Sequence, residues 1–86
     1  MSFRIVEVKA RPRRILRASA DQTEGVLRWR AVGDRLRLSV SDPAEVMPRI
    51  EKSLKKEGAK ISILREAKVS MEDVFIHLAE TQEAKA

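Results

Sequence analysis

The chain has no cysteine, which excludes disulfides, thiolate metal sites and thiol catalysis. It has one histidine, His77, and a single histidine does not make a metal site. The glycines Gly25, Gly33 and Gly58 stand far apart, so the chain has neither a Walker A phosphate loop nor a dinucleotide-binding glycine motif. The sequence therefore predicts no cofactor, no metal and no catalytic residue, and we expect a protein that is not an enzyme.

Aromatic residues and long apolar runs are also scarce. The aromatics are Phe3, Trp29 and Phe75. The core must therefore be aliphatic. No apolar run approaches the ~20 residues of a membrane span, and charged residues interrupt the first apolar stretch, so no signal peptide is visible. With 43% hydrophobic and 36% charged residues, the 86-residue chain has the composition of a folded protein. We expect one cytoplasmic domain over residues 1–80 and a frayed tail over 81–86.

Two alternating segments form the clearest structural pattern. In Val26–Val32, Leu27, Trp29 and Ala31 share one face, and in Arg35–Ser41 three aliphatic residues alternate with Arg35, Arg37 and Ser39. Gly33 and Asp34 between them favour a tight turn. The pattern predicts a hairpin with one apolar and one polar face.

The other elements follow from caps and periodicity. Asp42 is a good helix N-cap, Pro43 suits the first helical position, and Gly58 is a typical stop residue. The predicted elements outside the hairpin are a strand over Phe3–Lys9, a helix over Pro12–Ala20 before a turn at Asp21–Gly25, a helix over Pro43–Glu57, a strand over Lys60–Glu66 and a helix over Ser70–Glu80.

This order, β-α-β-β-α-β and one more helix, predicts an α+β fold, a ferredoxin-like βαββαβ sandwich with a four-stranded antiparallel sheet and an additional C-terminal helix. In this arrangement both crossing helices cover one face of the sheet. We expect that face to be built by Leu27, Trp29, Leu36, Leu38, Val40, Ile61 and Ile63. Val6 and Val8 should face the same core, whereas Phe3 and Ile5 should point the other way.

Positive charge is concentrated in the first half, where residues 1–40 carry ten Lys or Arg against four Asp or Glu. Arg28, Arg30, Arg35 and Arg37 should share the outer face of the hairpin as an anion-binding patch. Like charges that face each other cost stability, so acidic neighbours from the first or last strand, a partner or water must offset them. Phosphate contact is one interpretation, but no aromatic lies on that face to stack on a base.

The segment Val69–Leu78 has the features of a capped helix. Ser70 can accept hydrogen bonds from the first turn, and Asp73 can reach back to the Ser70 N–H. An apolar stripe at helical spacing should close the core. Its members are Met71, Val74, Phe75 and Leu78.

The same segment resembles the end of prokaryotic ABC-transporter ATP-binding subunits of the drug-export and ABC-2 type. The resemblance includes Ser70, Met71, Glu72, Asp73, Val74, Phe75 and Leu78, with Val69 where proline is usual, and extends in order to Gly25-Val26, Gly33-Asp34-Arg35-Leu36 and Asp42-Pro43. It implies a C-terminal accessory domain that follows the nucleotide-binding domain of an export ATPase. The Walker A, Walker B and signature motifs of such subunits lie in that upstream domain and are absent here.

Three functions remain open at this point. The chain is an interaction or regulatory domain that docks on an ABC ATPase domain or on a second copy, or a basic module that binds nucleic acid, or a small-molecule sensor of ferredoxin-like fold. For the first function, which places the chain at the inner face of the membrane only indirectly, through transporter subunits, we expect the partner-binding residues to be Glu72, Asp73, Ile76 and His77.

Overall fold

The computed structural model describes residues 3–76, and their element order is the predicted one. In chain order the elements are β1 (Arg4–Arg11), α1 (Arg13–Gln22), β2 (Val26–Val32), β3 (Arg35–Val40), α2 (Pro43–Lys56) and β4 (Lys60–Ala67). Residues 71–76 are also helical and are called the terminal helix below. The bounds differ from the predicted ones by at most two residues, which is the usual uncertainty at the end of an element.

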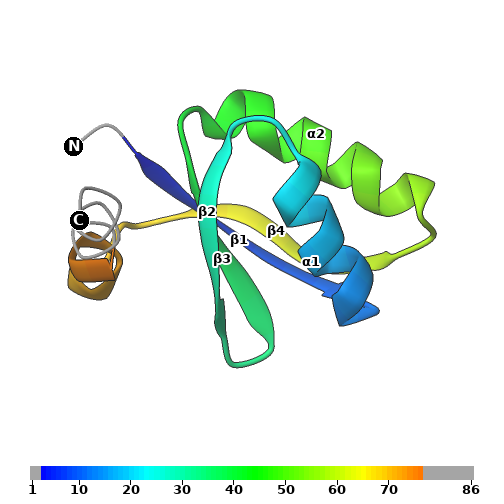
Figure 1. The fold of residues 1–86 in the computed structure, drawn as a ribbon, viewed down its shortest axis with the longest axis horizontal. Coiled ribbons are helices and arrows are strands. Elements are labelled where there is room, and N and C mark those ends of the chain that lie inside the picture. The colour runs from blue at the N-terminus through cyan, green and yellow to red at the C-terminus, as the bar shows by residue number, and fades with distance from the viewer. Residues whose placement is uncertain (1–2, 77–86) are drawn as a thin grey trace, which may run out of the picture.

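The strands form one antiparallel sheet in the order β2-β3-β1-β4. This order, with a helix after β1 and after β3, is that of a ferredoxin-like α+β fold and confirms the predicted fold class. Figure 1 shows α1 and α2 on one side of the sheet and the terminal helix away from them, at the end of the long axis where the N-terminus also lies. Within residues 3–76, no helix is long and apolar enough to cross a membrane.

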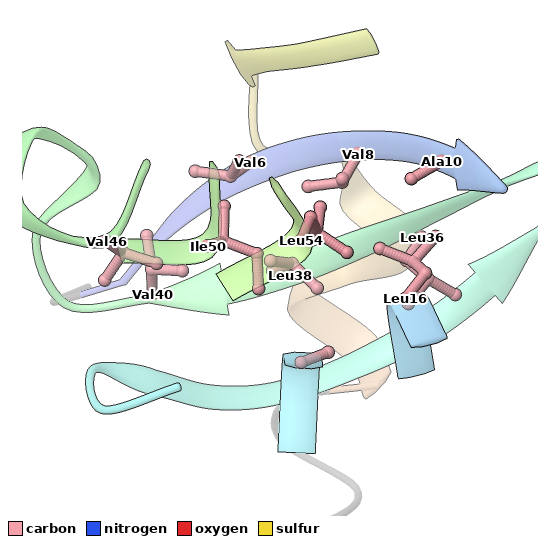
Figure 2. Packing of buried hydrophobic residues seen from close by; sticks show 11 residues of the cluster. Val6, Val8, Ala10, Leu16, Leu36, Leu38, Val40, Val46, Ile50 and Leu54 are labelled. Atoms are coloured by element: carbon pink, nitrogen blue, oxygen red, sulfur yellow. The ribbon is translucent and has the colours of Figure 1, made fainter. Parts of the chain in front are cut away.

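The core lies between the sheet and the two crossing helices, and it is aliphatic as expected (Figure 2). Its buried members are Val6, Val8, Ala10, Leu16, Ala20, Leu36, Leu38, Val40, Val46, Ile50 and Leu54. Trp29 packs against this cluster, and its indole Nε1 donates to Asp21 Oδ1 at 2.7 Å. A half-buried indole with a hydrogen-bonded N–H is typical of tryptophan at the edge of a core.

Two irregularities in the strand pairing correct the predicted core. Val26 pairs with Val40 and Arg28 with Ser39, so that Leu27 is an extra residue that leaves the alternation. Val26 therefore packs against the core, and Leu27, which was predicted to lie in it, is 53% exposed.

The second irregularity lies in β4. Lys9 pairs with Ile63 and Ala10 with Ile61, so the strand shifts by one residue between them. As a result Ile61 packs against the core, whereas Ile63 lies opposite Lys9 on the other face. The prediction that Ile61 and Ile63 share a face was wrong, and Leu64 packs against the core instead.

The face of the sheet that α1 and α2 do not cover is called the outer face below. Phe3 and Ile5 are only 4% and 1% exposed, yet neither belongs to the main core cluster. As predicted, both point away from Val6 and Val8, because successive side chains of a strand alternate between faces. The terminal segment lies over this outer face.

Gly25 is required where the turn after α1 passes close to α2. Its φ is +97°, and a Cβ built on it would lie 2.7 Å from Val46 Cγ2. Both the backbone conformation and the close approach favour glycine at this position.

We predict that Gly25→Ala lowers the free energy of unfolding by about 1–3 kcal/mol, because a methyl group there strains the backbone and displaces Val46. Gly33→Ala is the matched control, since Gly33 also has a positive φ, +60°, but no atom lies within 4 Å of its Cβ position. The control should lose about 1 kcal/mol from backbone strain alone. Urea unfolding followed by Trp29 fluorescence measures both, and equal losses would contradict the steric argument.

Candidate functional site

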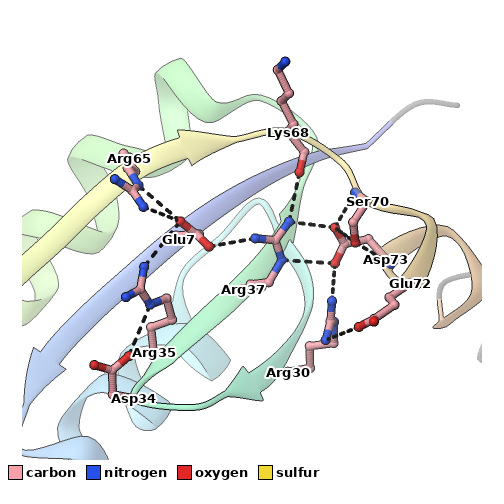
Figure 3. Close-up of polar contacts among 10 residues, drawn as sticks. All are labelled: Glu7, Arg30, Asp34, Arg35, Arg37, Arg65, Lys68, Ser70, Glu72 and Asp73. Atoms are coloured by element: carbon pink, nitrogen blue, oxygen red, sulfur yellow. Dashed lines mark hydrogen bonds and ion pairs between the residues drawn. The ribbon is translucent and has the colours of Figure 1, made fainter.

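The outer face of the sheet carries a network of arginines and carboxylates that joins the sheet to the terminal helix (Figure 3). Its members are Glu7, Arg30, Asp34, Arg35, Arg37, Arg65, Glu72 and Asp73. The alternation of the hairpin places its arginines here, as predicted. The structure therefore confirms a shared arginine face and shows what offsets its charge.

Arg37, in the middle of β3, is the centre of the network. Its Nε and Nη2 donate to the two carboxylate oxygens of Asp73 at 3.2 and 2.7 Å. Its Nη1 donates to Glu7 Oε2 at 2.7 Å, and Nη2 also donates to the Lys68 carbonyl at 2.9 Å. The side chain is 13% exposed, so these contacts are largely shielded from water. The hydrogen bond with Asp73, working against burial, raises the pKa of Arg37 above its ordinary value.

Arg30 on β2 lies directly opposite Arg37 and shares the same acceptor. The two residues are register partners, so their charges face each other across the strands. Arg30 Nη2 donates to Asp73 Oδ1 at 2.6 Å, and its Nη1 lies 4.0 Å from Glu72 Oε2. One carboxylate therefore bridges the two arginines and offsets the repulsion between them.

Glu7 on β1 neutralises the other side of Arg37. Its Oε1 accepts from Arg65 Nε and Nη2 at 3.1 and 3.0 Å and lies 3.7 Å from Arg35 Nη1. Burial raises the pKa of Glu7, but the hydrogen bonds from Arg65 and the charge of Arg37 outweigh it, so the pKa is lowered. An acidic neighbour from the first strand was one of the expected ways to offset the arginines, and Glu7 fulfils it.

The network ends at the hairpin turn. Asp34 lies 2.9 Å from Lys9 Nζ and accepts from Arg35 Nε at 3.2 Å. These two bonds lower the pKa of Asp34 to about 2.

The terminal helix begins with the predicted cap. The Ser70 N–H donates to Asp73 Oδ2 at 2.8 Å, and the Asp73 N–H donates to Ser70 Oγ at 3.2 Å, which is the reciprocal pattern of a capping box. The Ser70 hydroxyl also donates to Asp73 Oδ2 at 2.9 Å. Asp73 thus serves its own helix and the sheet at the same time.

The predicted apolar stripe of this helix was wrong. Asp73 points to the sheet and its side chain is 2% exposed, whereas Met71 and Phe75 are 71% and 64% exposed. Val74 is partly buried, and Leu78 lies outside the described residues. The ion pairs of Asp73 turn the helix so that its polar side is buried and its apolar side faces out.

The four residues expected to bind a partner are not equivalent. Asp73 is buried and cannot meet a partner while the helix is in place, which corrects the expectation that it is exposed. The Glu72 side chain is 82% exposed, and Ile76 is partly buried. His77 lies outside the described residues. Met71 and Phe75 were missed because their spacing is typical of a core stripe.

The arrangement offers little room for a small ligand or an ion. A cavity of about 10 Å³ lies between Arg28, Trp29 and Ile76, and one of about 20 Å³ lies beneath the hairpin turn. Each has space for about one water. Within residues 3–76, no three His, Cys, Asp or Glu side chains are grouped as metal ligands.

Comparisons with protein families, with curated proteins and with solved structures found no match to this chain. Any assignment of function therefore depends on the geometry and on the sequence resemblance.

We predict that Asp73→Asn releases the terminal helix from the sheet. Removing one partner of a buried ion pair costs about 3 kcal/mol, and a lost cap adds to this. The Val74 N–H, which donates to the Ser70 carbonyl, should then exchange with solvent about 100-fold faster in hydrogen-exchange measurements. Glu72→Gln is the matched control; because its side chain is 82% exposed, it should change stability by less than about 0.5 kcal/mol. Equal exchange rates in the two variants would contradict the role of Asp73.

We predict that helix docking weakens in acid. Burial by itself raises the pKa of Asp73, but bonds from Arg37, Ser70 and Arg30 outweigh it and hold the pKa well below 3.8. A carboxylate with a lowered pKa in the folded state stabilises that state at every pH above its unfolded pKa, and this contribution is lost as the pH falls through the folded value. The stability difference between the wild type and Asp73→Asn should therefore be constant above pH 4 and shrink below 3.8. A difference that stays constant below 3.8 would contradict this assignment.

Proposed function

We propose that this chain is a non-catalytic interaction domain that docks on the ATP-binding domain of an ABC export subunit, as its C-terminal accessory domain. The observation that carries the proposal is the orientation of the terminal helix. The ion pairs of Asp73 hold the helix on the sheet by its polar side, so Met71 and Phe75 face outward.

An outward apolar face on a fixed helix is unusual in a small domain. A helix at the edge of a domain ordinarily turns its apolar stripe to the core. Met71 and Phe75 are four residues apart and therefore lie on the same face of the helix. Exposed apolar residues that cluster mark interaction surfaces more often than singly scattered ones. Glu72 would lie at the polar rim of such a surface.

The sequence resemblance supports the same partner. The residues that carry it include Ser70 and Asp73, which build the cap, and Met71 and Phe75, which form the outward face. The N-terminus and the terminal helix lie at the same end of the long axis in Figure 1. A domain joined ahead of Phe3 would therefore emerge on the side where the docking face lies. Such a subunit would act in the cytoplasm, at the inner face of the membrane.

The other two candidate functions gain no support from the geometry. Arg30, Arg35 and Arg37 are engaged by carboxylates, which weakens the case for a nucleic-acid surface in this conformation. The cavities of about 20 and 10 Å³ are too small for a metabolite.

We predict that a chain with Met71→Ser and Phe75→Ser binds the partner ATP-binding domain at least tenfold more weakly than the wild type, because it lacks the apolar contact. Isothermal titration calorimetry with the ATP-binding domain encoded in frame ahead of Phe3 or beside this gene measures the affinity. Light scattering on the chain alone reports self-association through the same face.

The matched control replaces two exposed apolar residues of β2, with Leu27→Ser and Val32→Ser. Leu27 and Val32 are 53% and 38% exposed and lie away from the terminal helix. The control should bind like the wild type. Unchanged binding by the Met71 and Phe75 variant would disprove the docking face, and a gene with no ATP-binding domain in frame or nearby would remove the support for this partner.

A further inference from the structure

The outer face of the sheet has the properties of a binding site for an acidic helical turn. Arg37 offers a planar fork to both oxygens of the Asp73 carboxylate, and Arg30 donates to one of them from the neighbouring strand. Paired donors of this kind favour a carboxylate in one orientation. The bound side chain is 2% exposed, which means that the site encloses its occupant.

The occupant is a short and self-contained piece of chain. The hydrogen bonds of its cap join Ser70 and Asp73 to each other, so the turn keeps its cap wherever it binds. Its contacts with the arginines come from the Lys68 carbonyl and the carboxylates of Glu72 and Asp73. The recognised element therefore lies within residues 68–73 (Figure 3).

The occupant is joined to the sheet by a short connector. β4 ends at Ala67, and residues 68–70 are neither helix nor strand before the terminal helix begins at 71. A second copy carries the same turn and the same site, so every contact made within one chain can be made between two chains. Which arrangement forms depends on the effective concentration that the connector gives the turn of its own chain.

We propose that this site also binds the terminal segment of a second copy, so that two chains exchange residues 68–76 and each Asp73 enters the Arg30–Arg37 site of the other chain. Exchange of an identical element preserves the contacts of the monomer and is a low-cost route to a dimer. The proposal is independent of docking through Met71 and Phe75, since those side chains face away from the site.

The test is a chain that lacks Lys68 and Val69. Two residues span at most about 7 Å, so their removal shortens the connector enough to keep the turn from folding back on its own sheet. The shortened chain should be a dimer whose mass by light scattering is twice that of the wild type measured at the same concentration. A shortened chain that stays monomeric at every concentration would overturn the proposal.

Two further substitutions in the shortened chain show what holds the dimer. Arg37→Gln removes the fork and should return the mass to that of a monomer. Arg65→Gln is the matched control, because Arg65 contacts Glu7 at 3.0 Å on the same face and does not bind Asp73, and this chain should remain dimeric. A dimer that persists with Arg37→Gln, or is lost when Met71→Ser and Phe75→Ser are added, forms through another surface and overturns the proposal.

A mixing experiment decides the case if the shortened chain does not fold. Two full-length variants, Arg37→Asp and Asp73→Arg, each place like charges at the site, and each should be monomeric alone. When the two are mixed, the terminal turn of the Asp73→Arg chain can enter the site of the Arg37→Asp chain, where opposite charges meet again. Native mass spectrometry should then detect a heterodimer. Absence of a heterodimer at concentrations up to the millimolar range would overturn the proposal.

Discussion

The ion pair between Arg37 and Asp73 determines how the last described segment sits on the sheet. Removing two charges from water costs several kcal/mol for each ion, and only good geometry and further hydrogen bonds compensate for it. Both conditions hold here, because Asp73 accepts from Arg37, Arg30 and Ser70. Rotating the helix to bury Met71 and Phe75 would take the carboxylate away from two arginines that face each other across the strands. The arginine pair needs an anion more than the core needs two further apolar side chains.

Much of the fold was predictable because its signals are local. The alternation of the hairpin, the Asp42-Pro43 start of α2 and the Gly58 stop depend on neighbouring residues, and each appears in the structure. Asp42 accepts from the Ala44 N–H at 3.0 Å, and the Ala59 N–H closes the end of α2 on the Leu54 carbonyl at 2.9 Å. Once these elements are in place, short connections leave few ways to order the strands.

The faces of the edge strands were less predictable. In β2 and β4 the alternation breaks at a residue that the partner strand does not match, and a break of this kind depends on pairing across the sheet. The sequence around Leu27 continues the period-2 pattern, so nothing local indicates that Val26 takes the place in the core. Ile63 and Leu64 are adjacent aliphatic residues, and only the register with β1 decides which of them packs inside.

The site shows the same division between local and distant information. The bond from the Ser70 N–H to Asp73 spans three residues and was predicted, whereas the partners of Asp73 on the sheet lie 36 and 43 residues away. Hydrophobic periodicity therefore assigned the helix a face that a distant charge pair overrides. The arginine repulsion was the available clue, since it required acidic neighbours, but it did not indicate which carboxylate would arrive from the end of the chain.

The chemistry of Arg37 explains how one side chain can connect three parts of the fold. Its guanidinium donates to Glu7 on β1, to both oxygens of Asp73 and to the Lys68 carbonyl after β4. These acceptors lie on different sides of the group, and a planar fork with five N–H donors can reach them together where the three donors of an ammonium cannot. The position of β1 beside β3, the path of the chain after β4 and the orientation of the terminal helix are thus coupled through one residue. Because that coupling also fixes the direction in which Met71 and Phe75 point, the surface that this domain offers to a partner is determined by a polar contact on the opposite side of the helix.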